Sequence, residues 1–196
     1  WDVLSNTGSF KLFNNAIMQQ WLWIAFFGGV TRANFVLDNL DKVPFQTGGY
    51  KDRLKGEALF LRGLNYYYLV TFFKNIPLVT KYYEKAEEYF PSQANTDDVW
   101  NQIYADFNDA ASLLPTAYDA ANKGRATKGA ALAFLGKSYL FNKKYTEAAP
   151  KFKEVIDMHI YSLMPNYADN FTEAHENNAE SIFEIQFSRD IGGTTL

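Results

Sequence analysis

Five residues, spaced over two adjacent stretches of helical periodicity, constrain the fold of this chain more than any other feature. In chain order they are Leu135, Gly136, Tyr139, Ala148 and Phe152. The small residues allow two helices to approach closely, and the two aromatic rings fill the groove beside them. The spacing therefore predicts an antiparallel helix pair over residues 127–159, with Thr127 as the N-cap of its first helix.

The same spacing matches the tetratricopeptide pattern, W-x2-L-G-x2-Y followed by Ala and then, four residues later, Phe. Leu132 stands in place of the Trp, and the Pro that closes the pattern comes late, at Pro165. We predict a mainly α-helical fold of tetratricopeptide-like repeats, an α-α superhelix. An ordinary antiparallel helix pair is the alternative interpretation.

Helical periodicity also covers most of the chain before this pair. The apolar spacing predicts helices over residues 16–40, 51–74 and 96–114, the last capped by Thr96. Gly28-Gly29 either breaks the first of these helices or allows close contact with a neighbour. Residues 80–95, which are polar and aromatic, are predicted to form a long loop.

The end of the chain has a different pattern. From Ser181 to Phe187, apolar and polar residues alternate with the period of two that is typical of a strand. A lone strand needs partner strands, and the sequence offers almost none. We therefore expect an incomplete chain, in which residues 1–179 form the helical-repeat region and residues 180–196 begin a part that contains a short β element.

Composition narrows the classes of function. The 196 residues are 47% hydrophobic and 17% aromatic, which excludes a disordered chain. The net charge of -3 and the pI near 5.4 argue against a nucleic-acid partner. The longest apolar run, residues 21–30, is too short to span a membrane. The absence of cysteine excludes disulfides, thiolate metal sites and cysteine nucleophiles.

The sequence holds no motif typical of catalysis or of a cofactor site. His159 and His175 lack the spacing of a zinc site, and there is no phosphate-binding glycine loop and no nucleophile elbow. We therefore predict no enzymatic activity, no cofactor and no metal. We interpret three charged residues, Arg53, Glu57 and Arg62, as structural polar groups between helices. Arg53 and Glu57 are four residues apart, which is the spacing of an ion pair along a helix.

Several segments follow one another in an order that resembles a known family. The most recognisable block runs from Glu57 to Gly63 and continues through Tyr66 to Thr80. The other matching segments are 27–34, 106–115, 125–131, 161–163 and 180–185. Together they resemble the SusD/RagB family of surface lipoproteins, which help outer-membrane transporters to capture glycans.

The resemblance implies a protein on the external face of the outer membrane, lipid-anchored through a segment outside this chain and made with a signal sequence. It would capture a glycan or another oligomer, an oligosaccharide or a peptide, and deliver it to a TonB-dependent, SusC-like barrel transporter. The alternative is a helical-repeat accessory or scaffold subunit of an outer-membrane complex, with protein as its ligand.

Aromatic residues off the helix stripes are the candidates for ligand contacts, because sugar-binding proteins stack aromatic rings on sugar rings. Four such residues, Tyr82, Tyr83, Tyr89 and Phe90, lie in the predicted loop. Trp21 and Trp23 point to different sides of their helix. The predicted ligand-binding residues are Tyr82, Tyr83, Trp21 and Trp23. Packing against another part of the protein or against a partner is the alternative role.

Overall fold

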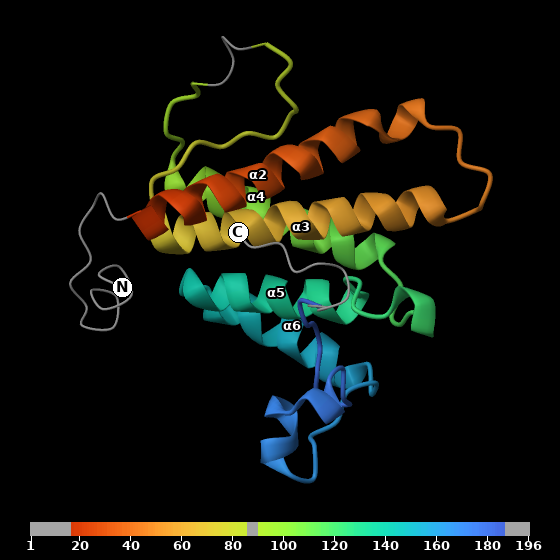
Figure 1. Cartoon of the computed structure of the whole chain (residues 1–196). Coiled ribbons are helices and arrows are strands. Elements are labelled where there is room, and N and C mark those ends of the chain that lie inside the picture. The colour runs from red at the N-terminus through yellow and green to blue at the C-terminus, as the bar shows by residue number, and fades with distance from the viewer. Residues whose placement is uncertain (1–16, 86–89, 187–196) are drawn as a thin grey trace.

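A computed structural model describes residues 17–85 and 90–186, which form five α-helices (Figure 1). The helices are α2 (Ile17–Asn39), α3 (Tyr50–Phe73), α4 (Thr96–Leu113), α5 (Lys128–Phe141) and α6 (Tyr145–Asp157). Short 3-10 helices cover Leu40–Lys42, Ala120–Asn122, Tyr167–Phe171 and Glu173–His175. Successive α-helices run in opposite directions, and each packs mainly against the next one along the chain. The predicted fold of tetratricopeptide-like helical repeats is confirmed.

α2 is one unbroken helix that passes through Gly28-Gly29. A Cβ atom at Gly29 would overlap the side chain of Asn65 on α3. The absence of that atom lets the two helices approach closely, so Gly29 serves helix contact and the glycine pair does not break the helix.

α3 lies between α2 and α4 and is buried on most of its surface (Figure 1). Phe60 and Tyr66 of α3 are fully buried, as are Ile103 and Phe107 of α4. These large side chains form the centre of the hydrophobic core, to which α5 adds Leu135. A helix that is apolar on several faces is stable only in such a sandwiched position.

The capping residues match the prediction at one helix and differ by one position at another. The Thr127 hydroxyl accepts a hydrogen bond from the Ala130 N–H at 3.1 Å, so Thr127 caps α5 as predicted. α4 is capped by Asn95 and not by Thr96, because the Asn95 side chain accepts the Asp97 N–H at 3.1 Å. Both residue types satisfy a free N–H group at a helix start, so sequence alone separates them poorly.

The α5–α6 pair has the close approach that its repeat spacing predicts. A Cβ atom at Gly136 would lie 2.9 Å from the Phe152 ring, and Ala148 is buried. The Tyr139 ring stacks on Tyr104 of α4 with the centroids 4.2 Å apart. Tyr139 therefore joins this helix pair to the preceding one.

The strand predicted over 181–187 is not found. Residues 181–186 form no ladder among the described residues, and Phe187 lies outside them. Its described neighbours are helices α3 and α5 and the loop residues Gly124 and Asn177, and none of these is a strand with which it could pair. It packs through its side chains instead, and the Phe183 ring lies 5.0 Å from that of Phe60.

Candidate functional site

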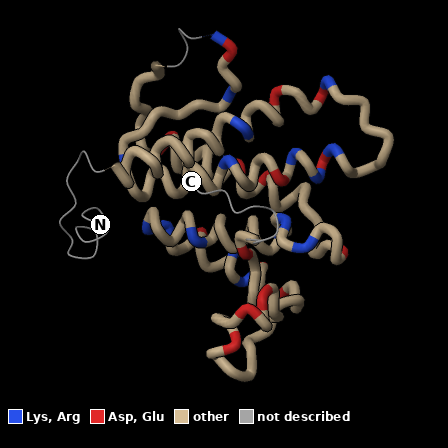
Figure 2. Tube along the Cα trace, viewed as in Figure 1, with Lys and Arg blue, Asp and Glu red and all other residues tan. Residues whose placement is uncertain are grey.

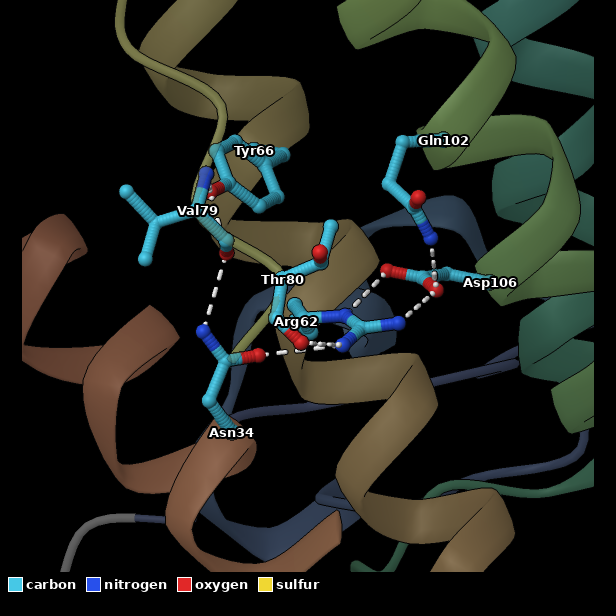
Figure 3. A network of polar contacts seen from close by, with 7 residues as sticks. All are labelled: Asn34, Arg62, Tyr66, Val79, Thr80, Gln102 and Asp106. Carbon is cyan, nitrogen blue, oxygen red and sulfur yellow. Dashed lines mark hydrogen bonds and ion pairs between the residues drawn. The ribbon is translucent and has the colours of Figure 1, made fainter. Parts of the chain in front are cut away.

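The candidate site is built around an extended segment, residues 76–83, that leaves α3 and returns alongside α2 and α3. Pro77 disfavours helical backbone in the residue before it, so α3 ends and the chain turns back. The segment has one β-bridge, between Pro77 and Gln93. Side chains from α2 and α3 also hold its backbone, and α4 supports one of them (Figure 3).

A buried ion pair joins α3 to α4 at the centre of these contacts. Arg62 donates from Nε to Asp106 Oδ2 at 2.9 Å and from Nη2 to Asp106 Oδ1 at 2.7 Å. Gln102 Nε2 donates to Asp106 Oδ1 at 2.8 Å (Figure 3). Two parallel bonds between a guanidinium and a carboxylate fix orientation as well as distance, so α3 and α4 are locked in one register.

The same guanidinium extends the network to the segment. Arg62 Nη1 donates to Asn34 Oδ1 at 3.0 Å and to the Thr80 carbonyl at 3.3 Å. Asn34 Nδ2 donates to the carbonyls of Val79 at 2.9 Å and Lys81 at 3.2 Å. Three consecutive carbonyl groups of the segment are thereby held by side chains of α2 and α3.

Tyr66 completes the attachment of Val79. Its hydroxyl donates to the Val79 carbonyl at 2.8 Å and accepts the Val79 N–H at 2.6 Å. Burial raises the pKa of Tyr66, so the hydroxyl stays neutral and can make both bonds. Val79 is therefore fixed through both of its backbone polar groups.

The ion pair is nearly closed to water. The Arg62 side chain is 8% exposed and that of Asp106 is 1% exposed. Burial acts to lower the pKa of Arg62, but the hydrogen bond and charge of Asp106 outweigh it and the pKa rises. Burial raises the pKa of Asp106, against the hydrogen bonds from Arg62 and Gln102. Each charge depends on its partner to remain in this position.

The segment also forms one wall of an open pocket of about 440 Å³. Its lining residues are Trp23, Phe27, Val30, Thr31, Pro77, Val79, Tyr83, Phe90 and Pro91. The Trp23 ring is supported by Phe27, with centroids 4.7 Å apart, and edge-on by Phe73 at 5.1 Å. The volume falls within the range of about 300–1,000 Å³ that small-molecule sites occupy.

The structure brings together two of the four predicted ligand-binding residues, Trp23 and Tyr83, with Phe90 beside them. Trp21 is 60% exposed and does not line this pocket. Tyr82 also lies outside it, because its ring packs edge-on against Phe35 at 5.1 Å. Tyr89 lies outside the described residues.

The buried network contains residues that the sequence analysis did not single out, namely Asn34, Asp106 and Gln102. A signal was present, because Asp106 precedes Phe107 on an apolar helix stripe and Arg62 sits in a helix that is apolar on most sides. A charged residue at such a position is stable only when it is paired. The sequence pattern does not indicate which partner it has.

A second pocket, of about 200 Å³, lies between residues 116–127 and 160–184. Two of its charged groups already have partners within the protein. Arg125 pairs with Glu57 at 3.0 Å, and Glu184 accepts the Asn177 N–H at 3.0 Å. We therefore regard the aromatic pocket as the stronger candidate for a ligand site.

Within the described part of the chain, no three His, Cys, Asp or Glu side chains gather closely enough to hold a metal ion. No helix within those residues has both the length and the apolar character that a membrane span needs.

Comparisons with known proteins all indicate the same family. A family described as SusD-like, starch-binding and associating with the outer membrane matches residues 6–140. A SusD-like protein of Formosa agariphila is 27% identical over 171 residues, which cover 87% of this chain and 32% of that protein. The chain thus spans about a third of the length of this curated relative.

Solved structures indicate the same family. A laminarin-binding SusD-like protein is 36% identical with a TM-score of 0.79, over 83% of this chain and 36% of that one. A SusD superfamily protein from Bacteroides vulgatus is 30% identical with a TM-score of 0.84, over 94% of this chain and 40% of that one. With these matches the chain belongs to the SusD/RagB family of SusD-like, outer-membrane-associated glycan-binding proteins.

Proposed function

We propose that this chain is the part of a surface glycan-binding protein that carries an aromatic sugar site, and that Trp23 and Tyr83 form this site. The observation that carries the proposal is the convergence of these two rings on one open pocket. Aromatic faces bind the apolar faces of sugar rings by stacking. The family of the chain supports a glycan as the ligand class.

The Trp23 ring and the backbone that leads to Tyr83 are held in place before a ligand arrives. Trp23 stands on an α-helix and rests on Phe27 and Phe73. Tyr83 is the last residue of the segment, whose carbonyl groups at Thr80 and Lys81 are held by Arg62 and Asn34. A site ordered in advance loses less conformational entropy on binding, which strengthens affinity without any new contact.

We further propose that the whole protein is lipid-anchored on the external face of the outer membrane and delivers glycan to a SusC-like, TonB-dependent barrel. In this role it binds and transfers its ligand and performs no catalysis. An exposed apolar stripe on α2, formed by Ile17, Trp21 and Ile24, supports contact with a protein partner. These residues are spaced i, i+4 and i+7 on one side of the helix.

Laminarin binding by the purified protein, measured by isothermal titration calorimetry, tests the sugar site. Trp23→Ala is expected to weaken binding at least tenfold, about 1.4 kcal/mol, because it removes the central stacking surface. Trp21→Ala is the matched control, since this tryptophan lies on the same helix but outside the pocket. If the two variants lose binding equally, or if neither loses any, the pocket is not the sugar site.

The stripe on α2 also supports the second candidate, a scaffold subunit whose ligand is protein. Co-purification from outer membranes separates the two roles. A barrel subunit that is retained together with glycan binding supports the delivery role. A protein complex that forms without any glycan binding supports the scaffold, and Trp21→Ala should then weaken that complex while Trp23→Ala should not.

A further inference from the structure

Arg53, in the first turn of α3, lines a pocket that is separate from the aromatic one. Its side chain is only 20% exposed, and its Nε atom is buried with no hydrogen-bond partner among the described residues. Buried polar groups in native proteins nearly always have a partner, so an unpaired one indicates a bound molecule. We infer that this pocket binds a small ligand in which a carboxylate is joined to an apolar body, with Arg53 as the group that binds the carboxylate.

The acidic group beside Arg53 is already bound by other donors. Glu57 Oε1 lies 3.5 Å from Arg53 Nε, and the two atoms make no hydrogen bond. The Tyr118 hydroxyl donates to Glu57 Oε1 at 3.2 Å, and Arg125 Nη1 donates to Glu57 Oε2 at 3.0 Å. Two arginines therefore share one carboxylate, which leaves this cluster with an excess of one positive charge. A ligand with one carboxylate would balance it.

Two tyrosine rings hold the Arg53 guanidinium in place. Its Cζ atom lies 4.5 Å from the centroid of the Tyr50 ring and 5.9 Å from that of Tyr118. Such contacts stabilise a cation through the face of the guanidinium and leave its N–H edge for other partners. A carboxylate that approaches this edge can accept two parallel hydrogen bonds, a geometry that a guanidinium matches and an ammonium group does not.

The pocket beside Arg53 has room for more than the carboxylate. Its volume is about 380 Å³, within the range of about 300–1,000 Å³ that small-molecule sites occupy. Leu113, Leu114 and Pro115, at the end of α4, form an apolar part of its wall, and residues 47–50 form another part. An apolar wall next to a guanidinium suits a ligand that carries its carboxylate on an aliphatic body.

The neighbouring charges on α3 provide a matched control. All charged residues of α3 lie between Lys51 and Arg62, and residues 63–73 carry none (Figure 2). Lys51 pairs with Asp41 at 2.7 Å. Lys55 is exposed and is not among the described residues that line the pocket. Lys55 therefore has the same sign of charge as Arg53 on the same helix, without its place in the pocket.

Hexanoate and its uncharged analogue hexanamide test the inference with the purified protein. Titrations followed by 1H–15N NMR monitor the Arg53 Nε–H group and the backbone amides of Gly48 and Gly49, which also line the pocket. We expect hexanoate to bind at least about tenfold more tightly than hexanamide, because only hexanoate accepts charge-assisted hydrogen bonds. Galacturonate, whose carboxylate sits on a polar body, and inorganic phosphate, which is not planar, should both bind more weakly than hexanoate.

Variants at two positions separate the role of Arg53 from the effect of net charge. In Arg53→Gln the Kd values of hexanoate and hexanamide should agree within about twofold. Arg53→Lys keeps the charge but lacks the planar N–H edge, so its preference for hexanoate should be intermediate. Lys55→Gln lowers the net charge equally and should keep the wild-type preference. Because Glu57 retains Tyr118 and Arg125, the Arg53 variants should fold, which melting curves check.

The preference for hexanoate over hexanamide decides the outcome. If the wild type binds the two probes equally or binds neither, or if the preference persists in Arg53→Gln, the inference is wrong. Tighter binding of galacturonate or phosphate than of hexanoate would also overturn it, because the apolar wall would then contribute nothing. These measurements do not involve Trp23 or Tyr83, so their failure would leave the proposed sugar site unaffected.

Discussion

The helix pairs α3–α4 and α5–α6 share one antiparallel arrangement but are held together by different chemistry. Between α5 and α6 the contact depends on a missing side chain at Gly136 and on the ring of Phe152. Between α3 and α4 it includes large buried rings and the buried ion pair of Arg62 with Asp106. The first contact is made by shape alone, and the second also requires charges to match.

This difference explains why only one of the two helix pairs affects the geometry of the pocket. A buried ion pair contributes little net stability over well-packed apolar residues, but removing one partner is costly. The α3–α4 pair also uses its arginine to hold Thr80 and, through Asn34, Val79 and Lys81. The α5–α6 pair has no such extension, so it supports the fold while α3–α4 also orders the pocket.

The largest expected effect comes from removing one charge of the α3–α4 pair. Arg62→Ala leaves the Asp106 carboxylate buried and without its cation, and should lower the free energy of unfolding by about 3–5 kcal/mol. Urea denaturation measures this change. Lys153→Ala is the control, because its pair with Asp157 is exposed and should contribute less than about 1 kcal/mol.

Replacing both charges sharpens the same comparison. Arg62→Met combined with Asp106→Leu should recover most of that stability, since no buried charge remains unpaired. The Thr80 carbonyl would still lose its donor, and Asn34 would lose the guanidinium that binds its side chain, so laminarin binding should stay weakened. A double variant that binds laminarin like the wild type would show that the network stabilises the fold without ordering the pocket.

The glycine contact of α5–α6 should give a smaller effect. A Cβ atom at Gly136 would lie 2.9 Å from the Phe152 ring, which must shift. Crowding costs about 1–3 kcal/mol and the better helix propensity of alanine returns about 0.5–1, so Gly136→Ala should lose about 1 kcal/mol in thermal or urea unfolding. At Gly28 the nearest atom is 3.6 Å away, and Gly28→Ala should gain about 0.5–1 kcal/mol. Equal effects at the two positions would contradict the close approach of α5 and α6.

The stability of the protein at alkaline pH tests the burial of Tyr67 on α3, and the expected effect is smaller than that of the substitutions above. Burial raises the pKa of Tyr67 to about 12, whereas an unfolded tyrosine ionises near 10. Between these values the folded state binds more protons than the unfolded state, so stability should fall as the pH rises from 10 to 12. Urea midpoints over this range should fall less steeply for Tyr67→Phe than for the wild type, while the exposed control Tyr167→Phe should follow the wild type.

How much of this could be predicted from the sequence depends on the kind of contact. The α5–α6 pair was predictable because Gly136, Ala148 and Phe152 are local and regularly spaced. The network of Arg62 was not, since Asn34 and Asp106 lie 28 and 44 residues away from it in the chain. The aromatic pocket could be predicted in part. The sequence indicates that Trp23 and Tyr83 lie off the helix stripes, but it does not show that the two rings line the same pocket. The strand expected near Phe183 is not formed among the described residues, because alternation indicates two-sided packing and does not show what the segment packs against.

The central claim is that the buried network acts on the pocket by holding the segment that carries Tyr83. A double-mutant cycle in laminarin binding tests it, with Asn34→Ala, Tyr83→Ala and the double variant measured by calorimetry. Because Asn34 holds the carbonyls of Val79 and Lys81, its loss should weaken binding in the wild type but add almost nothing once Tyr83 is absent. Fully additive losses, or no loss from Asn34→Ala alone, would contradict the claim.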